Sequence, residues 1–146
     1  MSIFNTPEMS AADDKLRGVV ALVHPGLECD PLNKRNQIGV ICEADIDLDN
    51  IYVDFVDKVG LFSADALLVL LPPDAIHQNL ADIAYEAALP DLKALTQIDL
   101  FLKYGDVNAR FKAMAIARDN PAVQPLCVEI LNKQISRDIP NQYGRD

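Results

Sequence analysis

The chain has no tryptophan, and Phe and Tyr supply only 6% aromatic residues among its 146 positions. A groove for proline-rich peptides or a cage for methylated lysine needs several aromatic side chains, so neither kind of recognition is predicted. Basic residues are also few, 13 against 22 acidic ones, and the net charge is −9. Because an acidic field repels phosphate groups, nucleic acid and anionic membrane surfaces are disfavoured as partners.

Cysteine is scarce as well. Cys29, Cys42 and Cys127 are odd in number and lack paired C-x-x-C spacing. This usage argues against a disulfide framework and indicates a reducing compartment, so we expect a cytoplasmic protein. No apolar run approaches the ~20 residues needed to span a membrane, and the N-terminal residues do not resemble a secretory signal. Neither membrane association nor a cofactor is predicted.

What the chain does contain is a change of hydrophobic rhythm at Pro72 and Pro73. Before these prolines, short runs rich in Val, Ile, Phe and Leu are separated by turn residues, a pattern typical of strands. After them, apolar residues recur every three or four positions, which is typical of helices. The sequence therefore predicts an α+β protein in which a small β unit precedes a helical unit.

Five strands are predicted before the prolines, with a turn at Pro25-Gly26 and a long polar loop after it. They are expected over residues 15–24, 37–44, 50–56, 58–62 and 66–71. Side chains alternate between the two faces of a strand, so in the third strand Ile51, Val53 and Phe55 share one face while Tyr52 and Asp54 share the other. We expect Tyr52 to face outward.

One stretch of the β unit resembles a known group. Gly60-Leu61-Phe62-Ser63-Ala64-Asp65-Ala66-Leu67-Leu68-Val69-Leu70 is similar to the closing segment of SH3-like barrels, where a Gly-aromatic strand, a 3₁₀ turn and a final apolar strand follow one another. Gln37-Ile38-Gly39-Val40-Ile41 resembles the glycine-containing strand of KOW-type members. The resemblance covers residues 15–71 and implies a five-stranded SH3-like small β-barrel. It implies no function, because one fold hosts many functions.

Four amphipathic helices are predicted after the prolines, joined by short links and therefore packed as an antiparallel bundle. They are expected over residues 74–89, over 90–104, from 106, and from 120 to just before Pro140. Gly105 suits the stop of the second helix and Asp106 the cap of the third. A helical repeat array is the alternative, although no residue pattern recurs between the helices.

The predicted organisation is a loose arm over residues 1–14, the barrel over 15–71, the helical region over 72–139 and a tail over 140–146. The β unit has more apolar surface than a barrel interior can bury, since two of its strands are apolar at odd and even positions alike. We expect Ile41, Leu68 and Leu70 to face outward. The helices are the nearest cover for them, in one compact unit, and a second chain is the alternative.

The acidic stretch between the second and third strands could suggest a metal site. Asp45, Asp47 and Asp49 have the spacing of the first three ligands of a calcium loop, but Val56 stands where the twelfth-position Glu is needed. We therefore interpret the stretch as a solvated hairpin tip and predict no metal. These three carboxylates, with Tyr52 and Asp54, are the candidate contacts for a partner.

No catalytic residue is predicted. His24 and Cys29 lie near one loop as a possible thiol–imidazole pair, but the sequence supplies no oxyanion donors for them. A zinc site with Cys42 as third ligand lacks a fourth. We expect a non-enzymatic protein-interaction or assembly module that binds a protein partner or itself. Two alternatives stay open: a KOW-like RNA- or ribosome-associated factor, and a thiol-dependent enzyme using the loop over residues 24–36.

Overall fold

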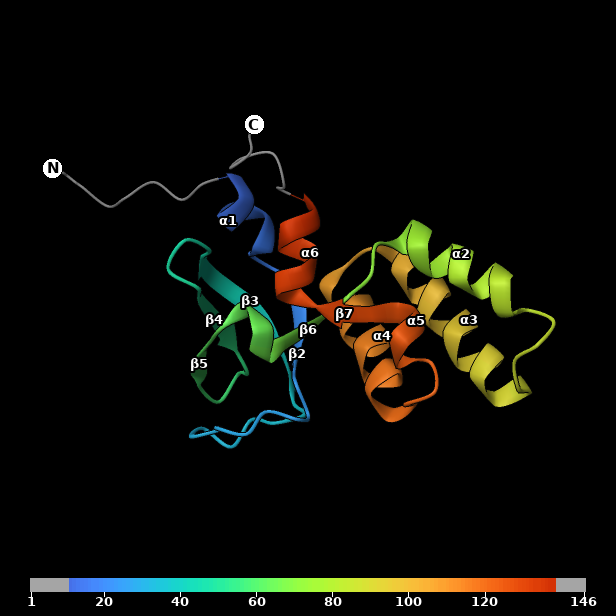
Figure 1. Ribbon diagram of the computed structural model, residues 1–146, viewed down its shortest axis with the longest axis horizontal. Coiled ribbons are helices and arrows are strands. Elements are labelled where there is room, and N and C mark those ends of the chain that lie inside the picture. The colour runs from blue at the N-terminus through green and yellow to red at the C-terminus, as the bar shows by residue number, and fades with distance from the viewer. Residues whose placement is uncertain (1–10, 139–146) are drawn as a thin grey trace, which may run out of the picture.

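The computed structural model describes residues 11–138, which form one six-stranded antiparallel sheet and six helices in a mixed α+β arrangement (Figure 1). The strands are β2 (Val20–Val23), β3 (Ile38–Asp45), β4 (Asn50–Asp54), β5 (Val59–Phe62), β6 (Leu67–Leu70) and β7 (Val128–Ile130). The helices are α1 (Ala11–Leu16), α2 (Pro73–Ile83), α3 (Leu89–Tyr104), α4 (Val107–Asp119), α5 (Gln124–Cys127) and α6 (Leu131–Asp138). A 3₁₀ turn, η1 (Ala64–Ala66), precedes β6. The α+β class is therefore confirmed.

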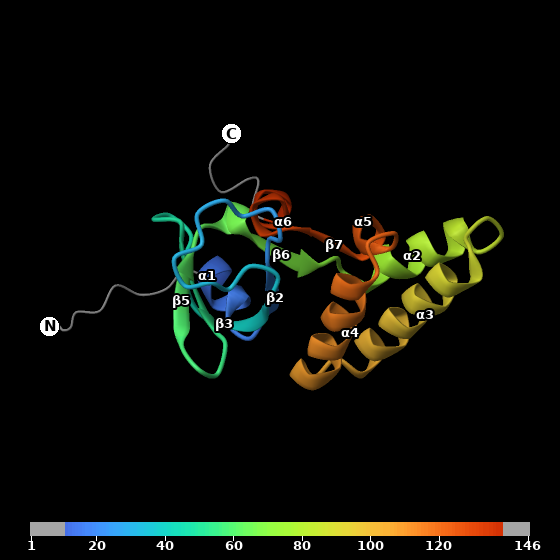
Figure 2. The ribbon, with the colours of Figure 1, turned by 90° about the horizontal axis from the view of Figure 1, so that it is seen from below.

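The sheet is open, with the strand order β5-β4-β3-β2-β6-β7. Its two edges are β5 and β7, so it differs from the closed five-stranded barrel that the sequence led us to expect. The edge β5 lies at one end of the molecule and helices α2 and α3 lie at the other, as two views at right angles agree (Figure 2).

Strand β7 lies where the sequence predicts one continuous helix from residue 120, and that prediction is wrong. Val128 pairs with Leu70 of β6, and the Leu71 N–H donates to the Cys127 carbonyl at 2.8 Å. The alternation of β-branched and polar residues from Val128 favours an extended backbone. Main-chain bonds to β6 reinforce that preference, so the helix is divided into α5 and α6.

The first predicted strand also begins later than expected. Helix α1 extends to Leu16, and the chain then turns through Gly18 at φ +90°, a backbone conformation that glycine adopts without strain. Strand β2 therefore starts only at Val20. Residues 1–10 of the predicted arm and the predicted tail lie outside the described residues.

The hairpin of β3 and β4 has the side-chain alternation that the sequence predicts. Ile51 and Val53 are fully buried, while Tyr52 is half-buried on the other face. The pairing register shifts between Ile41 and Glu43, so that β3 carries a bulge at Cys42. A bulge leaves two residues opposite one on the neighbouring strand and increases the local twist.

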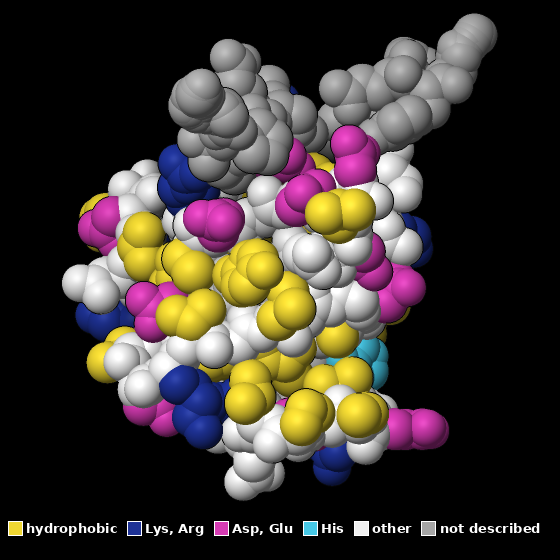
Figure 3. Space-filling model, turned by 90° about the vertical axis from the view of Figure 1, so that its left-hand side faces the viewer, with side chains coloured by type: hydrophobic (Ala, Val, Ile, Leu, Met, Phe, Trp, Pro, Cys, Tyr) yellow, Lys and Arg dark blue, Asp and Glu magenta, His cyan; other side chains and the backbone are white. Residues whose placement is uncertain are grey.

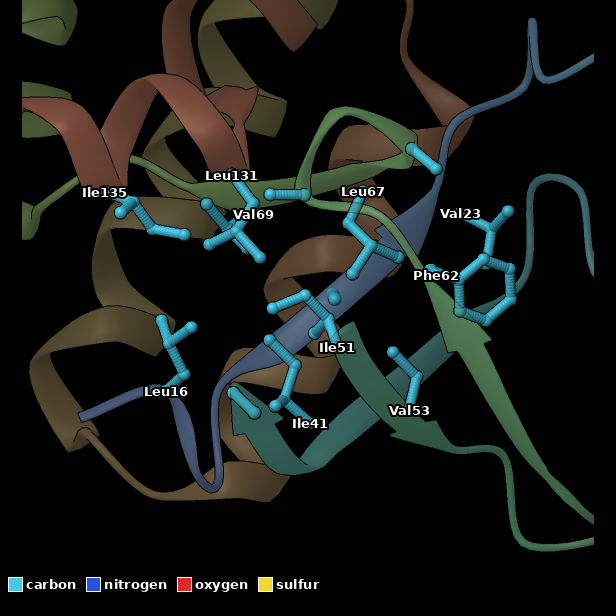
Figure 4. Packing of buried hydrophobic residues seen from close by; sticks show 14 residues of the cluster. Leu16, Val23, Ile41, Ile51, Val53, Phe62, Leu67, Val69, Leu131 and Ile135 are labelled. Carbon is cyan, nitrogen blue, oxygen red and sulfur yellow. The ribbon is translucent and has the colours of Figure 1, made fainter. Parts of the chain in front are cut away.

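The inner faces of five strands meet in one apolar cluster (Figure 4). Leu16 of α1 and Leu131 and Ile135 of α6 close this cluster from the helical side. Ile41 is fully buried in it and packs on this inner face, so its predicted outward position is wrong. Its neighbours Ile38 and Val40 take the opposite face instead.

Helix α4 covers the other face of the central strands. Met114 is fully buried and packs with Val20, Leu22 and Leu68, and Leu70 lies at the border of this cluster. The apolar surplus of β2 and β6 is therefore covered by a helix of the same chain, as we expected for Leu68 and Leu70. A two-faced strand such as β2, whose four residues are all buried, requires such a cover.

The helical end is built from α2, α3, α4 and α5 around a cluster that includes Ile76, Leu95 and Ile98. Two predicted boundaries are confirmed: Gly105 ends α3 at φ +76°, and the Asp106 carboxylate caps α4 by accepting from the Ala109 N–H at 2.7 Å. The four-helix bundle is not formed as expected, because α6 leaves the other helices to pack on the sheet. Within residues 11–138, no helix is both long and apolar enough to cross a membrane.

Candidate partner-binding face

The outer face of β3, β4 and β5 carries two of the five residues that the sequence nominated, Tyr52 and Asp54. The strand register forms one row from Glu43 through Tyr52 to Leu61, and a neighbouring row joins Asp54 to Val59. We call the exposed or half-buried side chains of this surface the β5 face; they are those of Cys42, Glu43, Tyr52, Asp54, Val59 and Leu61. Helix α4 covers β2, β6 and the first part of β3, where Ile38 and Val40 pack in the same cluster as Met114, and none of the six side chains of the β5 face belongs to that cluster.

The β5 face is apolar along β5 and acidic further into the sheet. Val59 and Leu61 are 53% and 52% exposed, which is high for aliphatic side chains in a strand. Figure 3 views the molecule from the side where β4 and β5 lie, and hydrophobic side chains gather there with both acidic and basic side chains around them. Contiguous apolar surface with a polar rim is characteristic of protein-interaction sites.

The bulge in β3 concentrates side chains next to Tyr52. Glu43 is the register partner of Tyr52, and Cys42, the extra residue, donates its S–H to the Tyr52 carbonyl with Sγ 3.5 Å from the oxygen. Both Cys42 and Glu43 are exposed. Tyr52, Cys42 and Glu43 are therefore neighbours on adjacent strands of the sheet.

Asp54, the second predicted contact, stabilises the turn between β4 and β5. Its Oδ1 accepts from the Val56 N–H at 2.8 Å. Val56 has φ +82° and is 98% exposed, so a β-branched side chain stands in solvent on a backbone that disfavours it. The turn thus adds one more apolar side chain beside the β5 face.

The other three predicted residues do not join this face. At the hairpin tip, Asp45 Oδ1 accepts from the Leu48 N–H at 3.3 Å, and Asp49 Oδ1 accepts from the Ala64 N–H at 2.8 Å. Asp47 is exposed in the same tip. The carboxylates of Asp45 and Asp49 therefore hold backbone rather than converge on a cation, and residues 11–138 contain no His, Cys, Asp and Glu group suited to a metal ion.

A buried lysine that the sequence analysis did not single out fixes the loop over residues 24–37. Lys34 is 5% exposed, and its Nζ lies 2.9 Å from both carboxylate oxygens of Asp57 and 4.9 Å from the Phe55 ring centroid. The hydrogen bond from Lys34 lowers the pKa of Asp57. This contact joins the first loop to the β4–β5 turn, 23 residues away in sequence.

The same loop contains Asp30, which organises its backbone. Its carboxylate accepts from the N–H groups of Lys34 and Arg35 at 2.9 and 2.7 Å, and these bonds hold the pKa of Asp30 below its usual range. Asp30 therefore fixes the backbone around Lys34, and Lys34 in turn holds Asp57 in the β4–β5 turn. The position of this turn is set by contacts within the chain.

The thiol–imidazole pair considered from the sequence is not assembled. His24 Nδ1 accepts from the Gly26 N–H at 2.9 Å and thereby closes the turn at Pro25-Gly26. Cys29 is exposed, and no contact within residues 11–138 joins it to His24. The role of His24 in the structure is therefore to stabilise this turn through its hydrogen bond with the Gly26 N–H.

His77 of α2 has a partner on the neighbouring helix α3. Its Nδ1 lies 3.1 Å from Asp99 Oδ2, and Lys103 Nζ lies 3.9 Å from the same oxygen. Asp99 is a buried carboxylate on α3, so this contact ties α2 to α3 across their interface. The sequence could not predict this contact from neighbouring residues, because His77 and Asp99 are 22 residues apart.

Two recesses lie away from the β5 face. One, of about 210 Å³, is walled mainly by apolar residues of β2, β6 and the following prolines, with Arg110 and Gln134 as its polar members. The other, of about 370 Å³, lies between α3 and α4 and includes Lys93 and Asp119. The first lacks the several convergent polar groups that fix a small ligand. The second also includes Gln97 and Asn120, but Asp119 already accepts from Arg118 and Asn120 donates to the Ile116 carbonyl.

Comparisons with protein-family models, with curated proteins and with solved structures gave no match to this chain.

Proposed function

We propose that this protein is a non-enzymatic interaction module that binds a protein partner through the β5 face. The observation that carries the proposal is the pair Val59 and Leu61, half exposed on an edge strand next to Tyr52 and the carboxylates of Glu43 and Asp54. Aromatic residues in the centre and polar groups at the rim are the usual composition of an interface.

The charge of the surroundings specifies the partner. Glu43 and Asp54 are exposed, and the chain as a whole carries −9. A partner that presents lysine or arginine beside apolar side chains would complement both features, and electrostatic attraction would accelerate its association. The same field opposes RNA, so the ribosome-associated alternative receives no support from this face.

We also propose that residues 15–71 are a partly open relative of SH3-like barrels. Support comes from the strand order β5-β4-β3-β2-β6, in which four consecutive strands form a meander and the last returns beside the first. The 3₁₀ turn η1 stands directly before β6, as the resemblance implies. The inner faces of these strands share one cluster. The cytoplasmic location remains a prediction, and the free thiols of Cys29, Cys42 and Cys127 agree with it.

A cross-linking pull-down from the native lysate tests the proposed function, with Leu61→Lys as the disrupting variant. The substitution places a cation in the centre of the β5 face and, since Leu61 is half exposed, leaves the core intact. Tyr85→Lys is the matched control, because Tyr85 is 99% exposed between α2 and α3, far from the face. We expect a protein captured by the wild type and by Tyr85→Lys to be lost with Leu61→Lys. Recovery of no partner, or equal capture by all three, would contradict the proposal.

A further inference from the structure

Strand β5 offers main-chain groups as well as side chains. The Phe55 N–H donates to the Lys58 carbonyl at 3.0 Å, which makes these two residues a hydrogen-bonded pair at the start of the β4–β5 ladder. Hydrogen-bonded and non-hydrogen-bonded pairs alternate in an antiparallel ladder. The pairs of Val59 with Asp54 and of Leu61 with Tyr52 are therefore non-hydrogen-bonded. It follows that the N–H and C=O groups of Val59 and Leu61 point away from β4, toward the open edge.

No described residue forms a backbone hydrogen bond with that edge. Among the backbone hydrogen bonds outside the helices and strands of residues 11–138, none involves Val59 or Leu61. Leu32 of the first loop approaches Gly60, whose Cβ would stand 2.8 Å from it, but Gly60 points to the inner side of β5. Proline and charged residues are the devices by which natural edge strands avoid pairing, and β5 contains neither between Val59 and Phe62, although the exposed Lys58 directly precedes it.

We infer that the partner binds as an additional strand along β5, in a mode that rests on the proposed function. The segment that binds is basic and apolar. Its main chain pairs with Val59 and Leu61, its apolar side chains lie beside theirs on the outer face, and its cations lie toward Asp54 and Glu43. Edge addition of this kind draws affinity from main-chain bonds and specificity from alternate side chains.

Charge decides between a different protein and a second copy. A second copy would bring its own Glu43 and Asp54 toward the same carboxylates, and two chains of −9 repel each other. Like charges across an interface disfavour a partner, whereas a cationic segment removes the repulsion among the carboxylates of the β5 face. The occupant is therefore a cationic strand of another protein.

The probe is a synthetic eight-residue peptide, blocked at both ends, in which valine and lysine take turns at the odd positions and threonine fills the even positions, so that valine and lysine share one face of the added strand. The control is the same peptide with glutamate in place of lysine. We expect the cationic peptide to bind at low salt, to lose affinity as salt is added, and to slow amide hydrogen exchange at Val59 and Leu61 by roughly tenfold or more. The glutamate peptide should leave both amides unchanged. Leu61→Pro removes one outward N–H without removing a bond to β4, and it should weaken binding by roughly tenfold or more, whereas Leu61→Thr, which keeps the N–H, should retain protection at Val59.

Each other result would overturn the inference in a recognisable way. Binding of the cationic peptide without protection at Val59 and Leu61 would mean docking on the face rather than at the edge, and the proposed function would survive. Equal binding of both peptides would remove the charge argument. A dimer in sedimentation, with both amides already protected in the free protein, would assign the edge to a second copy. Failure of the peptide to bind, with Leu61-dependent capture in the lysate experiment retained, would reject strand addition alone.

Discussion

The two edges of the sheet are treated in opposite ways. At the β7 edge the strand has three residues, is flanked directly by α5 and α6, and carries Glu129, whose carboxylate accepts from Arg137 at 2.8 and 2.6 Å. At the β5 edge the outward side chains are aliphatic and half exposed, and no helix within residues 11–138 covers them. Flanking helices and an ion pair therefore secure the β7 edge, although Ile130 is 36% exposed there, while Val59 and Leu61 leave β5 available for contact.

Backbone strain follows the same division. Four non-glycine residues of the described chain have positive φ, and all of them lie in the loops around β3, β4 and β5: Asn33, Asn36, Asp49 and Val56. Asparagine and aspartate tolerate this conformation, but valine does not. Strain of this kind persists where the surroundings fix the backbone, and here Lys34 and Asp54 do so.

The largest contrast is expected between two leucines, one beside each edge. Leu131 follows β7 and is fully buried in the inner cluster, whereas Leu61 is half exposed on β5. Leu131→Ala should lower the free energy of unfolding by about 2–5 kcal/mol through lost burial and a cavity, and Leu61→Ala should change it by less than about 1 kcal/mol. Urea unfolding followed by circular dichroism measures both. Equal losses would show that β5 is as well packed as β7.

A smaller contrast is expected between two glycines, one on the central strand and one on the edge. A Cβ on Gly39 would stand 2.5 Å from Val53 Cγ1 and 2.9 Å from the Asp54 carbonyl oxygen, and the latter is backbone that cannot give way. Gly39→Ala should therefore lose about 1–3 kcal/mol of stability by overpacking. Gly60→Ala meets only the side chains of Leu32 and Phe62, so its loss should be smaller. Thermal or urea unfolding of the two variants gives the order, and a larger loss at Gly60 would contradict it.

Sequence reasoning succeeded where the signal is local. The alternation through Ile51, Tyr52 and Val53 and the stop and cap at Gly105 and Asp106 depend on neighbouring residues, and all are found as predicted. Strand β7 depends on β6, some sixty residues earlier in the chain, and so escaped a reading that considered one segment at a time.

For the candidate face, the sequence placed Tyr52 and Asp54 on one side of a strand but could not show what lies beside them. Leu61 becomes the neighbour of Tyr52 only through the β4–β5 register. Asp45 and Asp49 were nominated for their charge, yet both carboxylates accept from backbone N–H groups, a role set by turn geometry. Lys34 was missed because a buried lysine is expected only once its carboxylate partner is known, and Asp57 lies on another loop.

The acid dependence of stability should report on the β7 edge. Arg137 lowers the pKa of Glu129, so the carboxylate stabilises the fold fully above its unfolded-state pKa, and this contribution is lost as the pH falls through the lower pKa of the folded state. The wild type should lose about 1 kcal/mol more than Glu129→Gln between roughly pH 5 and pH 3. Urea unfolding across that range measures the difference. Asp30 and Asp57 titrate in the same direction in both proteins, so the comparison isolates Glu129. If the wild type and Glu129→Gln lost the same free energy of unfolding over this pH range, the Glu129–Arg137 ion pair would not stabilise the β7 edge.

The smallest effect is expected at Val56, and it separates a structural from a functional reason for an exposed, strained valine. Val56→Gly relieves the strain of the positive φ in the folded state but raises the conformational entropy of the unfolded chain. Because these two effects nearly cancel, the free energy of unfolding should rise by no more than about 1 kcal/mol. Val56→Asn, which tolerates the same φ, should behave alike. If the β5 face and its turn are kept for a partner, both variants should bind the cationic peptide more weakly while unfolding at the same or higher urea concentration. If Val56→Gly unfolded at a lower urea concentration, the Val56 side chain would support the fold. The surface available to a partner would then be limited to Val59, Leu61 and the rest of the β5 face.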